Sequence, residues 1–241
     1  MVLFAINSFF SFYCYFFTKY TFFLDSYNTL TILNTNVKIF IFDTETTGFI
    51  DKKESDLDKQ PYIIQFAWIL WELKDGKWIE ISRINKTIKP PIPIPYWSSQ
   101  VHHLYDIDVM EKPNFESYVE IFLPFINDVD FIVGHNIEYD ESMFKLEMKR
   151  LGREYDYKPK QSVCTMYQSR DFCKLPKKMI GSPWYKLPKL WELYKILFWE
   201  YFVWAHDAMV DVEATVKCFL ELVKKEVIVL EKKSDSMISL F

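Results

Sequence analysis

The sequence lacks the excess of basic residues that general nucleic-acid binders carry. Its 241 residues hold 29 Lys and Arg against 33 Asp and Glu, a formal net charge of −4. Any binding of a polyanion must therefore depend on a local group of basic residues and on metal ions. One local basic excess fits either a solvated loop surface or a contact with a nucleic-acid strand. It comprises Lys158, Lys160, Arg170, Lys174, Lys177, Lys178, Lys186 and Lys189.

Cysteine is also scarce. The four cysteines form no C-x-x-C pair and are too sparse for a disulfide framework, so we interpret them as reduced thiols of a cytosolic protein. No internal repeat and no second domain is visible. A length of 241 residues with 50% hydrophobic residues suffices for one α/β domain with tails.

Phe, Tyr and Leu crowd the first 24 residues. This segment has neither the basic start nor the small cleavage-site residues of a secretory signal. It is long enough for a membrane anchor, which needs about 20 mainly apolar residues, although Asn7, Ser8 and Ser11 interrupt it. Three interpretations stay open: a membrane anchor, a packing element, and a dispensable extension translated from an early start codon. We expect an extension over residues 1–37, a domain over 38–225 and a tail over 226–241.

Hydrophobic periodicity predicts an α/β order after this extension. A buried strand is expected at Lys38–Asp43, and two further runs follow at Tyr62–Leu73 and Lys77–Ile88. The Asp75-Gly76 pair between these runs is typical of a hairpin turn. The first three strands should therefore be antiparallel.

The second half of the chain predicts helices around another strand. Residues Phe115–Ile126 have a helical pattern that Pro124 should kink or end, and a buried strand is expected at Phe131–Val133. Apolar residues at helical spacing predict a helix from Met143 to Leu151 and a closing helix from Val210 to Val223.

Three short acidic stretches occur in a fixed order, FDTETTG at 42–48, GHNIEYD at 134–140 and HDAMVD at 206–211. Asp43 and Glu45 end the first strand, and alternation along a strand points both carboxylates to one face. Such a pair repels itself and is costly to desolvate unless a cation lies between its members. Magnesium suits this place because it takes hard oxygen ligands and keeps waters for a substrate phosphate. Together the stretches can place four carboxylates and one imidazole around two divalent ions.

These stretches resemble the three exonuclease motifs of the DnaQ-like (DEDDh) 3′-5′ exonucleases. The resemblance covers residues 38–225 and extends to IIQFA at 63–67 and LWELY at 190–194. It implies an α/β fold of the RNase H-like type. The first three strands of its mixed central sheet would be antiparallel, with helices on both faces.

The resemblance also implies a role for each of five residues. Two Mg²⁺ ions, with Mn²⁺ as the alternative, would be bridged by Asp43. Glu45 and Asp211 would complete the shell of the first ion, and Asp140 would act on the second, directly or through water. His206 would be the general base, since an imidazole titrates near neutral pH. Asp140 alone could instead cap a helix.

Substrate contacts are expected from the loop after the first motif. Thr46 and Thr47 precede Gly48, and this glycine permits a tight turn that brings backbone donors near a terminal sugar. Phe144, one turn beyond Asp140, is expected to pack against the terminal base, with a place in the core as the alternative.

Two positions depart from the family pattern. His103 replaces the glycine of a His-Gly-Ile loop, in which His102 aligns with the histidine, and Trp199 stands where relatives often have glycine. Both departures predict locally reshaped loops. Asp207 and Glu213 have no matching role and are expected to be surface charges.

The sequence thus predicts a metal-dependent 3′-5′ exonuclease that releases nucleoside monophosphates from single-stranded DNA, in replication proofreading or repair. RNA is the alternative substrate, as in the oligoribonuclease and RNase T branches, because discrimination depends on contacts to the 2′-hydroxyl that no short motif reveals. The hypothesis from another class is a non-catalytic adaptor tethered to a clamp or a membrane. The retained acids count against it.

Partners and location are expectations of the same kind. Residues Met237–Phe241 resemble the short peptides by which bacterial replication proteins dock on the sliding clamp, with methionine in place of glutamine; an ordinary apolar tail is the alternative. No polymerase domain is present, so a polymerase subunit would have to be another chain. The expected location is cytoplasmic, with membrane anchoring through residues 1–37 as the alternative.

Overall fold

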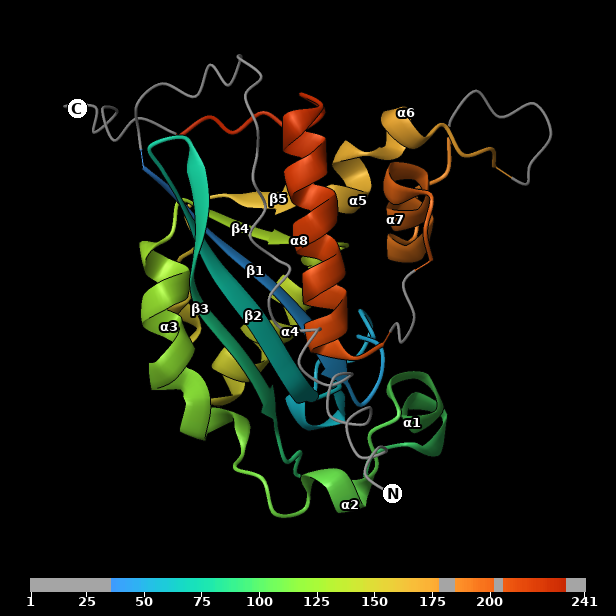
Figure 1. Cartoon of the computed structure of the whole chain (residues 1–241). Helices are drawn as coiled ribbons and strands as arrows, with labels where there is room; N and C mark the ends of the chain where they lie inside the picture. Colours follow the sequence, from blue (N-terminus) through green and yellow to red (C-terminus); the bar gives the residue numbers. More distant parts are fainter. Residues whose placement is uncertain (1–35, 178–184, 202–205, 233–241) are drawn as a thin grey trace, which may run out of the picture. The chain divides into compact units, whose positions relative to one another are not determined.

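A five-stranded mixed sheet in the order β3-β2-β1-β4-β5 carries the rest of the fold (Figure 1). The computed structural model describes residues 36–177, 185–201 and 206–232. The strands are β1 (Val37–Thr46), β2 (Ile63–Lys74), β3 (Lys77–Thr87), β4 (Phe131–Gly134) and β5 (Ser162–Cys164). β1 to β3 pair antiparallel, β4 runs parallel to β1, and β5 runs parallel to β4. The predicted RNase H-like fold and its three antiparallel strands are confirmed.

The hairpin between β2 and β3 turns at the expected pair. Asp75 and Gly76 have φ angles of 52° and 75°. Two successive left-handed residues match the twist of the flanking strands, and Asp-Gly tolerates them at low cost. β1 continues past its predicted end to Thr46, and a bulge between Glu45 and Thr46 shifts its pairing with β2. Asp43 and Glu45 therefore lie among the last residues of a paired strand.

Helices cover both faces of the sheet. The helices are α1 (Tyr96–His102), α2 (Asp106–Val109), α3 (Val119–Asp128), α4 (Ile137–Arg150), α5 (Thr165–Gln168), α6 (Arg170–Cys173), α7 (Leu190–Phe198) and α8 (Ala208–Lys224). Short 3₁₀ turns occur at Leu57–Lys59, Phe115–Tyr118 and Glu154–Asp156. Figure 1 shows α8 across one face of the sheet, with α3 and α4 on the other.

The two faces bury different side chains because residues alternate along β1. Phe40 and Phe42 point to the face covered by α3 and α4, where rings dominate the core. Ile39 and Ile41 point to the opposite face, against α7 and α8. Ile228, beyond α8, is also buried in this second core.

Phe144 belongs to the aromatic core, which corrects its predicted contact with substrate. The side chain has no exposed surface, and its ring centroid lies 4.8 Å from that of Phe122 and 5.1 Å from that of Phe66. A residue on α4 can face either the sheet or the carboxylates, and Phe144 packs against the sheet.

Pro124 does not end its helix. α3 continues to Asp128, although Pro124 lacks the amide that would bond the Glu120 carbonyl. Both residues lie on the exposed side of α3, where water can serve that carbonyl.

The expected terminal segments fall largely outside the described residues. The described part of the extension consists of residues 36 and 37, and the motif Met237–Phe241 is not described. Within residues 36–177, 185–201 and 206–232, no helix combines the length and the apolar character needed to cross a membrane. The membrane anchor and the clamp-binding motif therefore stay predictions.

Candidate active site

Asp43 and Glu45 project from the carboxyl end of the central strand β1. Burial raises the pKa of Asp43 well above the ordinary carboxyl range, and the charges of Asp140 and Asp211 raise it further. Burial and the same two neighbours raise the pKa of Glu45 to about 8. The pair therefore resists ionisation, as expected for clustered acids without a counter-charge.

Asp140 is fixed to β1 between these two acids. Its Oδ1 accepts hydrogen bonds from the Thr44 amide at 3.0 Å and the Thr44 hydroxyl at 2.7 Å. Asp140 is buried in the first turn of α4, whereas Glu138 in the same turn is exposed. Burial raises the pKa of Asp140 to about 7, against the lowering effect of the two bonds from Thr44. Bonds from β1 thus single out Asp140 among the acids of this helix.

The third motif forms the start of α8. His206 has a left-handed φ of 75°, and its amide donates to Oδ2 of Asp211 at 2.9 Å. Ligand atoms of Glu45, His206 and Asp211 all lie within 4.8 Å of one another. Burial and the nearby His103 and Lys189 lower the pKa of His206, so its imidazole is neutral at physiological pH.

Asp207 is a helix cap, which corrects its interpretation as a surface charge. Its Oδ1 accepts from the amides of Met209 at 3.0 Å and Val210 at 3.2 Å. Gln65 donates to Oδ2 of Asp207 at 3.2 Å and accepts from the Ala208 amide at 3.1 Å. Because Gln65 lies opposite Glu45 on β2, this network fixes the start of α8 beside the carboxylates. An Asp just before a helical pattern is the signal that could have found the cap.

An Asp207→Ala variant should lose about 1 kcal/mol of unfolding free energy, because two amides at the start of α8 lose their acceptor. Asp207→Asn should lie between the parent and the Ala variant in stability, since its amide oxygen keeps the two cap bonds but its amide nitrogen cannot accept from Gln65. Urea unfolding of both variants measures the difference. Equal stability of the Ala and Asn variants would show that the cap contributes nothing.

The loop after β1 is held by its own side chains. The Tyr139 hydroxyl donates to the Gly48 carbonyl at 2.6 Å, and the Thr46 hydroxyl lies 2.8 Å from both atoms. Thr47 is buried, and its hydroxyl accepts from the Tyr62 amide at 2.9 Å. The side chains of Thr46 and Thr47 therefore shape the loop, and their predicted contact with substrate stays a prediction.

The predicted tight turn does not explain why position 48 is a glycine. Its φ is not among the positive values, but a Cβ on it would lie 3.3 Å from the Trp97 ring. The close approach of the indole favours glycine, because a Cβ would push the ring away by a few tenths of an ångström. The ring of Trp97 also stacks on that of Phe49, with centroids 5.7 Å apart and planes at 18°. Phe49 is 79% exposed and Trp97 50%, so the aromatic pair borders the site and remains open to solvent.

His103 and Trp199, the two departures from the family pattern, each follow the end of a helix, and the predicted reshaping of their loops stays a prediction. His103 and Trp199 both have a φ of 59°, and their amides close the last turns of α1 and α7 on Ser99 and Lys195. Both residues thus adopt the left-handed backbone conformation that favours glycine, at a cost of about 1 kcal/mol each.

His135 is a structural residue that sequence reasoning left without a role. Its Nε2 lies 3.0 Å from the Pro188 carbonyl and its Nδ1 lies 3.0 Å from the Thr165 hydroxyl. Because a carbonyl only accepts, Nε2 carries the proton. Burial lowers the pKa of His135 to about 4, so the ring is neutral and joins the end of β4 to two later segments.

The donor set fits hard divalent ions. Carboxylate oxygens predominate, with one imidazole, and the raised carboxyl pKa values show a negative site without a compensating cation among the described residues. The structure brings together Asp43, Glu45, Asp140, His206 and Asp211 from β1, α4 and the start of α8, and their roles as metal ligands and general base stay predictions.

Known proteins share this sequence and fold. The sequence profile of the family described as Exonuclease matches residues 40–219. The chain is 27% identical over 154 residues to an uncharacterized exonuclease, CP81, of Escherichia phage 186, covering 62% of this chain and 71% of that protein. It is 30% identical over 122 residues to DNA polymerase III subunit epsilon of Treponema pallidum, covering 51% of each. The chain thus spans about half the length of the second relative.

Among solved structures, the zinc-bound ExoI-ssDNA complex of E. coli has a TM-score of 0.58 at 19% identity, covering 79% of this chain and 41% of that one. Exonuclease I of Methylocaldum szegediense has a TM-score of 0.58 at 16% identity, with the same coverage. At these identities the likeness shows the fold alone. The profile match spans most of the chain and includes the metal-site motifs within it. The chain belongs to the exonuclease family, with the DnaQ-like motifs and RNase H-like fold of its nucleases.

Proposed function

We propose that this nuclease is a divalent-metal-dependent exonuclease that removes nucleotides one at a time from the 3′ end of single-stranded DNA. One observation carries the proposal: Glu45, His206 and Asp211 converge within 4.8 Å, beside Asp43 and the buried Asp140. A cluster whose members raise each other's pKa is characteristic of functional sites. An adaptor that uses only the fold has no physical need for it.

Asp43, Glu45, Asp140 and Asp211 would hold two divalent ions, with magnesium as the first candidate and manganese as the alternative. Bound ions of this kind lower the pKa of an attacking water and neutralise the charge that develops on the leaving 3′-oxygen. The chain itself fixes two of the four carboxylates: Thr44 holds Asp140, and the His206 amide holds Asp211. Such bonds orient ligands and support metal affinity.

His206 would accept the proton of the attacking water. Its neutral ring has a free site for that proton, and its exposed position at the start of α8 leaves it accessible to the substrate. Its backbone bond to Asp211 places the imidazole beside the acids. The proton would then leave through solvent.

The aromatic pair of Phe49 and Trp97 supports a single-stranded end. Exposed rings stack on unpaired bases whatever their sequence, and these rings border the loop that follows Glu45. DNA is the proposed substrate because relatives named as DNA polymerase III subunit epsilon match this chain. The same relatives support work beside a polymerase carried by another chain. RNA remains the alternative substrate.

Digestion of matched DNA and RNA oligonucleotides tests the proposal. With magnesium, a 5′-labelled strand should shorten as a ladder, and a 3′-labelled strand should release its label at once as a nucleoside monophosphate. Chelator should stop both reactions. Faster cleavage of RNA would assign the enzyme to the RNA-trimming alternative, and immediate release of the 5′ label would reverse the direction. A folded protein that cleaves neither strand with metal would support the adaptor.

A further inference from the structure

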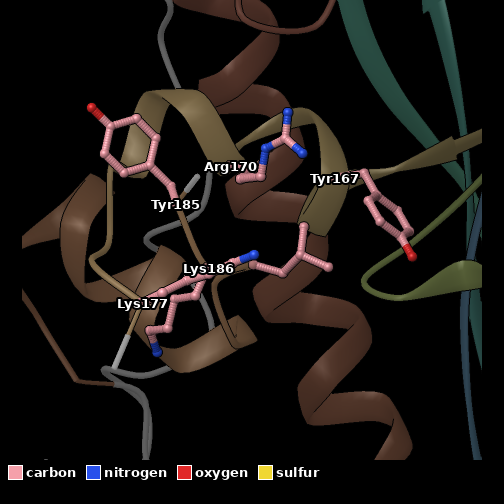
Figure 2. A pocket seen from close by; sticks show the side chains of 6 residues that line it. Tyr167, Arg170, Lys177, Tyr185 and Lys186 are labelled. Atoms are coloured by element: carbon pink, nitrogen blue, oxygen red, sulfur yellow. The ribbon is translucent and has the colours of Figure 1, made fainter. Parts of the chain in front are cut away.

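A cavity of about 510 Å³ has a lining that includes none of the carboxylate residues. Its lining comes from α5, α6 and the segments on either side of residues 178–184, and it comprises Tyr167, Arg170, Lys177, Tyr185, Lys186 and Leu187. Figure 2 shows Arg170 and Lys186 between Tyr185 and Tyr167, with Lys177 below Tyr185. No residue of the proposed metal site takes part in this lining.

The cavity combines positive charge with aromatic surface. Tyr167 is 44% exposed and Tyr185 38%, so both rings can receive a planar partner. Arg170 pairs with Asp171, and Lys186 pairs with Glu192. The Asp171 side chain is 73% exposed, and a surface ion pair of this kind is weak enough to rearrange around a phosphate, whereas the Glu192 side chain is 14% exposed and fixes Lys186 in the wall of the cavity. Basic groups that track a backbone and rings that stack on bases are the two components of single-strand binding sites.

The walls of the cavity are anchored to the element that carries the active site. The Lys186 amide donates to the Leu175 carbonyl at 2.9 Å, which joins the two segments of the lining. His135, at the end of β4, contacts Thr165 at the start of α5 and Pro188 next to the lining residue Leu187. α4, which holds Asp140, begins directly after His135 and its neighbour Asn136. The cavity therefore has a fixed place relative to the carboxylates.

A basic segment connects the cavity with the third motif. Lys186 lines the cavity, and Lys189 directly precedes α7, which packs against α8, the helix that the third motif begins. The proposed path of a strand from the carboxylates to the cavity runs along this segment. The acidic cluster and the net charge of −4 repel a polyanion, so local cations along this path are needed to hold it.

We propose that this cavity binds a nucleotide of the single-stranded substrate upstream of the 3′ end that is being hydrolysed. The phosphate would lie against the basic side chains and the base against a tyrosine ring. The inference rests on the proposed function for its choice of ligand. Its consequence is a length dependence, because strands that reach the cavity bind more tightly than strands that end before it.

The test measures binding and cleavage separately with Lys177→Glu and Tyr185→Ala. Both side chains lie at the surface, so neither change removes a buried group. Binding is followed by the fluorescence anisotropy of a labelled single strand of about 20 nucleotides in chelator, where hydrolysis stops. Cleavage is followed on the same strand and on a dinucleotide. Lys77→Glu is the matched control: it makes the same charge change at an exposed position of the β2–β3 hairpin, outside the cavity and outside the basic excess.

Each variant should weaken binding of the long strand and raise its KM by about tenfold, as expected for loss of one stacked or phosphate contact. Cleavage of the dinucleotide and kcat should stay at the parent values, and Lys77→Glu should leave all of them unchanged. The proposal is overturned if both variants bind the long strand as Lys77→Glu does, or if the parent protein binds long and short strands equally. Absence of cleavage by the parent contradicts only the proposed function, since binding in chelator still decides the cavity.

Discussion

An Asp43→Asn variant is expected to release nucleotides about a thousandfold more slowly than the parent protein while folding normally. Asp43 is the acid of β1 whose pKa responds to Asp140, Asp211 and Glu45 together, which identifies it as the centre of the cluster. Asparagine has nearly the same shape but no charge to hold a divalent ion. Rates on a labelled single strand under magnesium, with circular dichroism as the folding control, measure the effect.

The same substitution should stabilise the metal-free protein at alkaline pH. Burial and neighbouring charges raise the pKa values of Asp43, Glu45 and Asp140, so the folded state holds protons that the unfolded chain releases. Stability is then greatest below the unfolded carboxyl pKa, near 4, and is lost as pH rises toward the raised values. The Asn variant removes one of the repelling charges and should lose less.

Thermal melts in chelator at about pH 5 and about pH 8 test this sign. The parent Tm should fall with rising pH, and magnesium should restore it most at the higher pH. Asp58→Asn is the matched control, because it removes an exposed charge outside the cluster and should change neither rate nor pH dependence. If Asp43→Asn melted lower than the parent in chelator at the higher pH, mutual repulsion would not describe the site.

Local chemistry accounts for what the sequence predicts well. Alternation along β1 puts Asp43 and Glu45 on one face, and Asp75-Gly76 fixes the hairpin that makes the strands antiparallel. These features depend on neighbouring residues, so a sequence pattern contains them. The other two acids of the cluster, Asp140 and Asp211, are predicted from the order of the three motifs along the chain.

Contacts between distant segments account for what the sequence misses. Thr44 binds Asp140, and Gln65 binds the start of α8, but the sequence around Thr44 and Gln65 does not indicate which residue each side chain contacts. Phe144 follows Asp140 by one helical turn, and only the packing of α4 on the sheet decides that it is buried. His103 and Trp199 adopt a left-handed backbone because the hydrogen bonds that end α1 and α7 outweigh its strain.

A His206→Asn variant is expected to lower kcat by about a hundredfold to ten-thousandfold, the usual contribution of a general base. Asparagine suits this position because it tolerates the left-handed backbone, φ of 75°, that His206 adopts. The parent rate should rise with pH through the lowered pKa of His206 and then level off. The variant should keep rising with pH, because solvent hydroxide must then remove the proton.

His206 has a second possible role, because its ring nitrogen is within 4.8 Å of ligand atoms of Glu45 and Asp211. A base and a ligand differ in what happens to metal affinity. If His206 is the base, His206→Asn keeps the magnesium-induced rise in Tm and loses only rate. If it is a ligand, the rise in Tm shrinks as well, and the assignment as base is wrong. His103→Asn is the matched control, since it removes a neighbouring imidazole from the same backbone conformation. Loss of its charge should raise the pKa of His206 and move the acid limb to higher pH, with the plateau rate unchanged.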